Sequence, residues 1–172
     1  EFGADALALA LALSVLQTVL SAAGRARRSP VLAGAAEGAA IGAAAATALA
    51  FAALIYAFVI SDFSVANVAA NSHTDKPMLY KVAAAWGSHE GSLLLWVFML
   101  AGWALAVSVF SRRLPPDMVA RVLAVLGLIT VGFLAFMLAS SNPFDRLLPA
   151  AVDGRDLNPL LQDPGMIFHP PM

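Results

Sequence analysis

Residues 92–110 read SLLLWVFMLAGWALAVSVF, a run that contains no charged side chain. Its length is close to the roughly 20 residues that cross a bilayer as a helix. Three other apolar runs lie at about residues 2–23, 31–60 and 119–139. Periodicity alone does not separate a buried soluble helix from a spanning one, but four such runs in succession favour spanning. The sequence therefore predicts an all-α integral membrane protein, with four transmembrane helices in a single membrane domain over residues 1–172.

The composition also favours a membrane protein. The sequence is 60% hydrophobic and only 12% charged, whereas a soluble domain carries about 25% charged residues. The net charge of −1 and the lack of a basic stripe with interleaved aromatic residues argue against nucleic acid as a partner. Cysteine is absent, which excludes disulfides, thiolate ligands and thiol catalysis within this sequence. Any thiol chemistry that the function needs must come from a partner.

The arginines predict an orientation in the membrane. They gather around the two short loops that follow the first and the third apolar runs, as Arg25, Arg27, Arg28, Arg112, Arg113 and Arg121. Short loops rich in arginine stay on the cytoplasmic side, so the N-terminus and the loops 61–91 and 140–172 are predicted to lie outside. Lys76 and Lys81 in the first outer loop weaken this bias. We expect these lysines either to be solvated or to contact anionic groups.

The outer segment 140–172 combines prolines with apolar side chains. Prolines punctuate it at positions 143, 149, 159, 164, 170 and 171, and this density forbids a long helix and favours extended or turn geometry. Phe144, Leu148 and Phe168 are among its apolar residues. A stiff, apolar segment packs on the membrane surface or on a partner more readily than it stays disordered. We therefore predict two ordered outer loops.

All three histidines, His73, His89 and His169, lie outside in this topology. A neutral imidazole nitrogen is a ligand for metals and for haem iron. His169 follows Phe168 and precedes two prolines at 170–171, so its backbone is stiff and its surroundings are apolar. Such a setting suits an iron ligand, although a loop histidine that only forms hydrogen bonds is the alternative interpretation.

The motif WGSHEGS at residues 86–92 stands directly before the apolar run that opens this section. Its His-Glu pair lacks the His-Glu-x-x-His spacing, so zinc-dependent hydrolysis is not expected. We predict that a helix opens near Gly91 or Ser92 and that the carboxylate of Glu90 complements its positive end. Trp86, His89 and Glu90 then form either a polar collar that caps the helix or the lining of a ligand site.

The second apolar run contains one acidic residue, Glu37. An ionisable group at membrane depth is a functional hypothesis by default, with pairing to the nearby arginines as the alternative. Gly34, Gly38 and Gly42 recur at four-residue spacing in the same run. Glycines on one helical face let a neighbouring helix approach closely, so we predict tight helix packing there.

Several longer motifs carry a family resemblance. They read DFSV at 62–65, YK at 80–81, WGSHEGSLLLW at 86–96, SSNPF at 140–144 and DGRDLNPLLQDPGMIFHPP at 153–171. With them the sequence resembles the N-terminal part of CcmF, the family of large haem-handling subunits in bacterial cytochrome c maturation. The resemblance covers nearly the whole sequence.

The resemblance implies a function and a site. Members of this family receive haem from a periplasmic haem carrier protein and promote its thioether attachment to apocytochrome c, together with thiol-handling maturation subunits. It implies a protein of the bacterial inner membrane with a periplasmic active face. Haem b is the expected substrate and a candidate resident cofactor. His169 is the expected axial ligand of the haem iron, and Trp86, His89 and Glu90 are expected to line the vestibule over it; the resemblance identifies no catalytic residue.

Parts of the family pattern are missing from this sequence. The Trp-rich haem segment, the second outer histidine and the two membrane-embedded histidines of the family have no counterpart here. We therefore expect the sequence to be part of a larger haem lyase and to be inactive alone. The rival hypothesis is a non-catalytic membrane scaffold or transporter-like module that docks partners through its outer loops.

Overall fold

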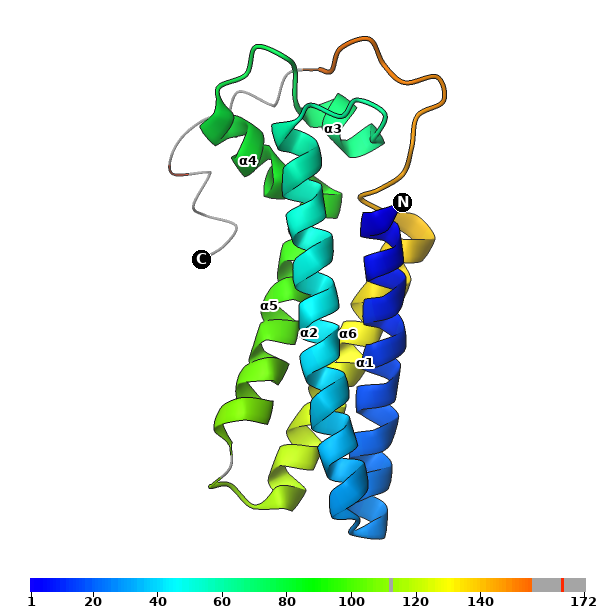
Figure 1. Ribbon diagram of the computed structural model, residues 1–172, viewed down its shortest axis with the longest axis vertical. Coiled ribbons are helices and arrows are strands. Elements are labelled where there is room, and N and C mark those ends of the chain that lie inside the picture. Colours follow the sequence, from blue (N-terminus) through cyan, green and yellow to red (C-terminus); the bar gives the residue numbers. More distant parts are fainter. Residues whose placement is uncertain (112, 156–164, 166–172) are drawn as a thin grey trace.

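The computed structural model describes residues 1–111, 113–155 and 165. This part of the chain forms six helices, α1 (Phe2–Arg27), α2 (Pro30–Val59), α3 (Ala66–Asn71), α4 (Met78–Gly87), α5 (His89–Phe110) and α6 (Pro116–Ser140). The long helices α1, α2, α5 and α6 run side by side as an up-and-down bundle (Figure 1). The short helices α3 and α4 lie at one end of it together with residues 141–155.

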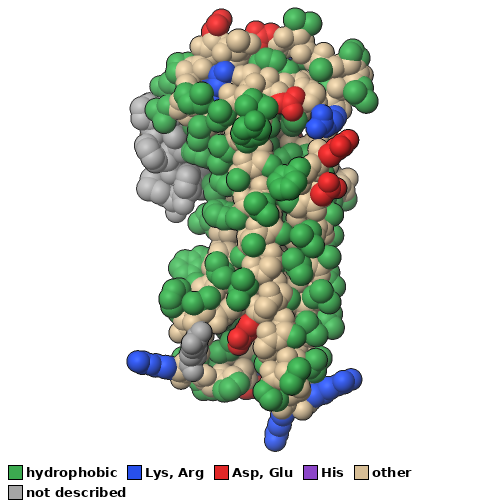
Figure 2. All heavy atoms as spheres, in the orientation of Figure 1, with side chains coloured by type: hydrophobic (Ala, Val, Ile, Leu, Met, Phe, Trp, Pro, Cys, Tyr) green, Lys and Arg blue, Asp and Glu red, His purple; other side chains and the backbone are tan. Residues whose placement is uncertain are grey.

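The four long helices are each long and apolar enough to cross a membrane. This confirms the predicted all-α integral membrane fold. Figure 2 shows that charged side chains on the visible face lie mainly toward the two ends of the bundle, with mostly hydrophobic side chains between them. The helices extend past the apolar runs at several ends, because polar and proline residues there still fit the first or last turn.

Local sequence sets the two short connections at the end away from α3 and α4. Ser29 caps α2, since its Oγ accepts a hydrogen bond from the N–H of Leu32 at 3.4 Å, and Pro30 follows as the first helical residue. At the other connection Pro115 precedes α6 and Pro116 opens it. Proline suits this position because its missing N–H would have no partner in a first helical turn.

Helix α2 contacts each of the other three long helices through alanines rather than glycines. Its buried face consists mostly of alanines, among them Ala36, Ala40, Ala43, Ala46 and Ala50. The predicted packing on the glycine face is wrong for Gly34 and Gly38: both are exposed, and no atom would lie within 4 Å of an added β-carbon. Only Gly42 meets a neighbour, the side chain of Leu13 in α1. The alanines pack and these two glycines do not, because the alanine side of α2 lies toward the other three long helices.

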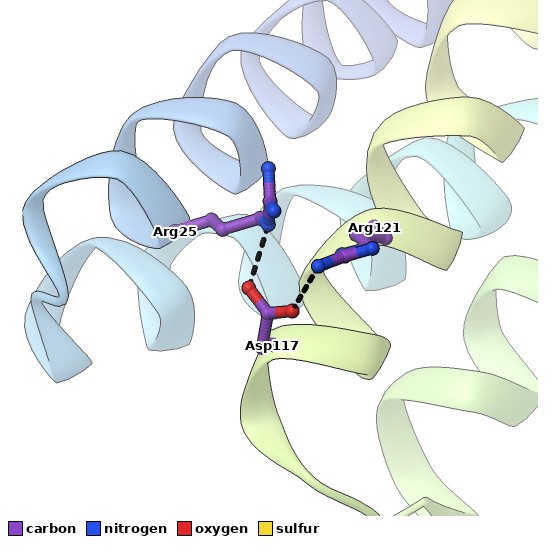
Figure 3. Close-up of polar contacts among 3 residues, drawn as sticks. All are labelled: Arg25, Asp117 and Arg121. Carbon is purple, nitrogen blue, oxygen red and sulfur yellow. Dashed lines mark hydrogen bonds and ion pairs between the residues drawn. The ribbon is translucent and has the colours of Figure 1, made fainter.

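Helices α1 and α6 meet through polar groups buried in the bundle. Gln17 is buried, and its Nε2 donates to the main-chain oxygen of Leu123 at 2.8 Å. Gly127 allows the close approach of α1, because a β-carbon there would lie 2.5 Å from the Thr18 hydroxyl and 3.2 Å from the Gln17 amide. At the end of the same contact, Asp117 accepts from Arg25 at 2.6 Å and pairs with Arg121 at 2.7 Å (Figure 3).

Candidate functional site

The WGSHEGS motif forms the junction between α4 and α5. Ser88 ends α4 and caps α5, because its Oγ accepts the N–H of Gly91 at 3.0 Å. Helix α5 therefore begins at His89, earlier than the predicted start at Gly91 or Ser92. Glu90 consequently lies in the first turn of α5, where a carboxylate complements the positive helix end.

The three candidate residues of this motif have different surroundings. Trp86 is half-buried and packs against the core of the bundle. The ring of His89 is exposed, and its Nδ1 lies 3.2 Å from the Oγ of Ser141, a buried residue just after α6. Glu90 is half-buried. The junction thus ties α5 to the end of α6 and leaves the far side of one imidazole open to its surroundings.

A cap covers this end of the bundle; we use this name for residues 60–88 and 141–155. Two backbone hydrogen bonds join its two segments: Ala66 N–H donates to the oxygen of Asp145 at 2.7 Å, and Leu147 N–H to that of Ser64 at 2.8 Å. They flank an isolated antiparallel bridge between Val65 and Arg146. The second segment is therefore paired with the first along its backbone.

The lysines of the cap are buried, so the expectation that they are solvated charges is wrong. Lys81 is 8% exposed, and its Nζ donates to Ser61 Oγ at 2.7 Å and to the oxygen of Thr74 at 3.0 Å. Lys76 is 6% exposed and donates to the oxygen of Asn71 at 3.1 Å. A buried ammonium needs such acceptors, so each lysine fixes the loop around it.

Asp153 anchors the far end of the second segment. Its Oδ1 accepts from the N–H of Gly154 at 2.7 Å, the N–H of Thr74 at 3.1 Å and the Thr74 hydroxyl at 3.2 Å. The hydrogen bond from Gly154, followed by those from Thr74 and the field of His73, lowers the pKa of Asp153 below its usual 3.8. A β-carbon at Gly154 would overlap the oxygen of Ser72, so this close approach requires glycine.

Three of the four site residues predicted from the sequence are among the residues that the structure describes. Trp86, His89 and Glu90 lie together at the α4–α5 junction, whereas His169 lies outside the described residues. No cluster of three or more His, Asp or Glu that could hold a metal ion occurs in the described part of the chain. The exposed imidazole of His89 is a donor that fits haem iron as a single ligand.

Sequence reasoning missed Ser141 and Asp153 as ordering residues. Ser141 stands in the SSNPF motif, which carried only the family resemblance, and its contact to His89 joins residues far apart in the sequence. Asp153 followed by glycine is a turn signal, which could have indicated an ordered loop but not its partner Thr74.

Comparison with known proteins places this architecture in a family. Residues 86–172 match the family described as cytochrome C assembly protein. The chain is 51% identical to the cytochrome c-type biogenesis protein CcmF of Escherichia coli K12 over 100% of its own length and 27% of that protein. It is 54% identical to CcmF of Pseudomonas aeruginosa, over 100% of its own length and 26% of that protein. It is 53% identical to the cytochrome c-type biogenesis protein ccl1 of Rhodobacter capsulatus, over 99% of its own length and 26% of that protein.

A solved structure agrees with these relatives. The structure of the cytochrome c haem lyase CcmF superposes with a TM-score of 0.77 at 30% identity, over 84% of this chain and 24% of that one. The chain spans about a quarter of the length of the relatives it matches. The resemblance seen in the sequence is thereby confirmed, and the four long apolar helices agree with a multi-pass membrane protein. The chain belongs to the cytochrome c assembly protein family.

Proposed function

We propose that the chain is part of a cytochrome c haem lyase. In this function it helps to receive haem from a periplasmic haem carrier and promotes thioether attachment to apocytochrome c. The observation that carries the proposal is the identity of about half of all residues to CcmF proteins along the entire chain. The match extends over the outer segments as well as the apolar helices, so it reaches beyond a shared membrane fold.

His169 is the residue that we assign to the haem iron, as an axial ligand. It lies within the range 86–172 that matches the family, and the two following prolines stiffen its backbone. Trp86, His89 and Glu90 line the approach to it in this proposal. The exposed ring of His89, held at Nδ1 by Ser141, supports this role because its other nitrogen has no partner among the described residues.

The proposed location is the bacterial inner membrane, with the cap on the periplasmic side. There the cap would meet the haem carrier and the apocytochrome. This sequence contains no cysteine, and we propose that thiol-handling maturation subunits keep the apocytochrome thiols reduced. Haem b is the proposed substrate, and we also propose it as a resident cofactor of the whole protein.

The test is replacement of His169 in the complete lyase system. We expect His169→Gly to reduce covalent cytochrome c strongly, as seen by haem staining, and added imidazole to restore part of it. Immunoblots of the membrane fraction control for protein abundance. His89→Ala should lower maturation less, because that ring is not the assigned ligand. Normal maturation by the His169→Gly variant at normal abundance would refute the ligand assignment.

The competing proposal is a docking scaffold, favoured by one feature of the cap. Leu148 is 91% exposed, and Val152, four residues later in the chain, is fully exposed, so the cap offers apolar side chains that a partner could cover. The optical spectrum of the purified complete protein separates the two functions. A haem-handling protein shows a Soret band, and a scaffold shows none.

A further inference from the structure

Two adjoining cavities lie at the arginine-rich end of the bundle, far from the cap. The first has a volume of about 140 Å³ and lies between all four long helices, where Ser21, Glu37, Ser108 and Ser111 contribute polar groups to its wall. The second has a volume of about 580 Å³ and includes Arg25, Arg28 and Asp117 in its wall. Ala33, Pro116 and Ala120 border both cavities, so they are neighbours.

The first cavity offers hydrogen-bond acceptors and a negative charge. Ser21 is 1% exposed, and its Oγ has no hydrogen-bond partner among the described residues. Glu37 is half-buried in the apolar helix α2, and no hydrogen bond or ion pair joins it to any described side chain. The Ser108 hydroxyl gives its proton to the oxygen of Ala104 at 2.9 Å, which leaves its lone pairs free. A carboxylate in such a place calls for a cationic partner.

The second cavity carries the opposite charge. Asp117 pairs with both Arg25 and Arg121 (Figure 3), so this group of three retains one positive charge. Arg28, the residue that caps the C-terminal end of α1 in a left-handed conformation with φ of 50°, adds a second positive charge. These residues lie at the ends of spanning helices, which is the depth of lipid phosphates. Glu37 lies about two helical turns further in, about 12 Å along α2.

We propose that the two cavities together bind the headgroup of a phospholipid that carries a primary ammonium. The ammonium donates to Glu37 and Ser21 in the first cavity, and the phosphate lies against Arg28 and Arg25 in the second. Long arginine and glutamate side chains bring the charged groups within reach of one headgroup. A free metal cation fits less well because the arginines at the entrance repel it. A purely anionic lipid fits less well because Glu37 repels it.

The exposed side chains beside the second cavity suit the rest of such a lipid. Val31 and Met118, in the first turns of α2 and α6, are both exposed. They provide apolar contact for the upper part of the acyl chains. The proposal is independent of the proposed haem lyase function, because it uses residues at the opposite end of the bundle.

The test compares three lipids on the purified complete protein in mild detergent, by native mass spectrometry and by thermal stability. Phosphatidylethanolamine should bind roughly tenfold more tightly than phosphatidylcholine, which lacks N–H donors, or phosphatidylglycerol, which lacks the cation. Glu37→Gln should remove the preference for phosphatidylethanolamine. Arg28→Gln should weaken binding of every phospholipid tested. Asp5→Asn, an exposed acidic residue at the other end of α1, should change nothing.

Equal binding of the three lipids by the unaltered protein would overturn the proposal without any variant. Tighter binding of phosphatidylglycerol would show a simple basic patch instead of a zwitterion site. An unchanged lipid preference in a folded Glu37→Gln protein would also refute it.

Discussion

Gly91 illustrates how much a single residue constrains the α4–α5 junction. A β-carbon at this position would overlap the main-chain oxygen of Ala85 in α4. The close contact lets α5 start directly after the Ser88 cap, so that His89 and Glu90 occupy its first turn. The glycine is therefore required by the approach of two backbones and not by a left-handed conformation.

The first prediction concerns this glycine. Gly91→Ala should lower the stability of the protein by roughly 1–3 kcal/mol, because α4 must move away from α5. Gly102→Ala in the same helix is the matched control: no atom lies within 4 Å of its added β-carbon, so its effect should stay within about 1 kcal/mol and favour the helix. Thermal unfolding in detergent measures both. Equal stability of the two variants would contradict the proposed contact.

The second prediction concerns pH and the cap. Because hydrogen bonds from Gly154 and Thr74 lower the pKa of Asp153 below 3.8, its stabilising contribution is present above this value and is lost as the pH falls through the lower, folded-state pKa. The protection factor of the Thr74 amide, taken against the intrinsic exchange rate at each pH, should therefore fall at acidic pH. Asp153→Asn should show the lower protection factor already at neutral pH and little further change on acidification. Parallel pH profiles of the two proteins would refute this anchor.

At the scale of the helices, buried polar contacts specify which faces meet. The amide of Gln17 reaches the main chain of α6 at Leu123, and Gly127 allows the approach. Ser14 and Ser21 are buried on the same side of α1, but their hydroxyls have no hydrogen-bond partner among the described residues, so Gln17 provides the hydrogen bond of this contact. Apolar packing against lipid distinguishes helix faces poorly, so such hydrogen bonds carry much of the specificity between spanning helices.

The third prediction tests this contact between helices. Gln17→Leu should destabilise the α1–α6 pair by about 0.5–1.5 kcal/mol, the usual range for a hydrogen bond between membrane helices. Val15→Leu, at a lipid-facing and exposed position of α1, is the control and should have no measurable effect. Unfolding by denaturing detergent, followed by circular dichroism, compares the two. A Gln17→Leu protein as stable as the control would show that the hydrogen bond contributes nothing.

At the scale of the whole molecule, the cap and the arginine-rich turns lie at opposite ends of the bundle (Figure 1). The prediction that the cap lies outside follows from arginine placement alone. Lys76 and Lys81 in the cap weaken this predicted orientation, because positive charges favour the cytoplasmic side. In the structure both lysines are buried and donate hydrogen bonds to acceptors of the cap itself, so they are not exposed loop charges.

The fourth prediction tests that orientation with single introduced cysteines. This sequence has none, and any cysteine elsewhere in the complete protein is first replaced by serine. A membrane-impermeant maleimide should label Val152→Cys in intact spheroplasts, since that residue is fully exposed in the cap. Arg113→Cys, in the turn between α5 and α6, should be labelled only after the membrane is permeabilised. The reverse pattern would show that the cap lies in the cytoplasm.

The sequence predicted the fold well and the candidate site only in part. Residues 92–110 and the three other apolar runs indicated four helices, and the structure has them. The position of His89 close to a helix start was also predicted, although the expected start at Gly91 or Ser92 lies two to three residues after the observed one. The contact of His89 with Ser141 was not, since the two residues lie at the ends of different helices.

The sequence by itself determined the membrane class, the number of long helices and the family, because each depends on composition and motifs along the chain. Only the tertiary structure decided which face of α2 packs, where the alanines and not Gly34 or Gly38 meet other helices. It also decided that Lys81 is buried and that Glu37 lies in a cavity with Ser21. These outcomes depend on contacts between residues far apart in the sequence, and hydropathy along one helix does not encode which neighbour it will meet.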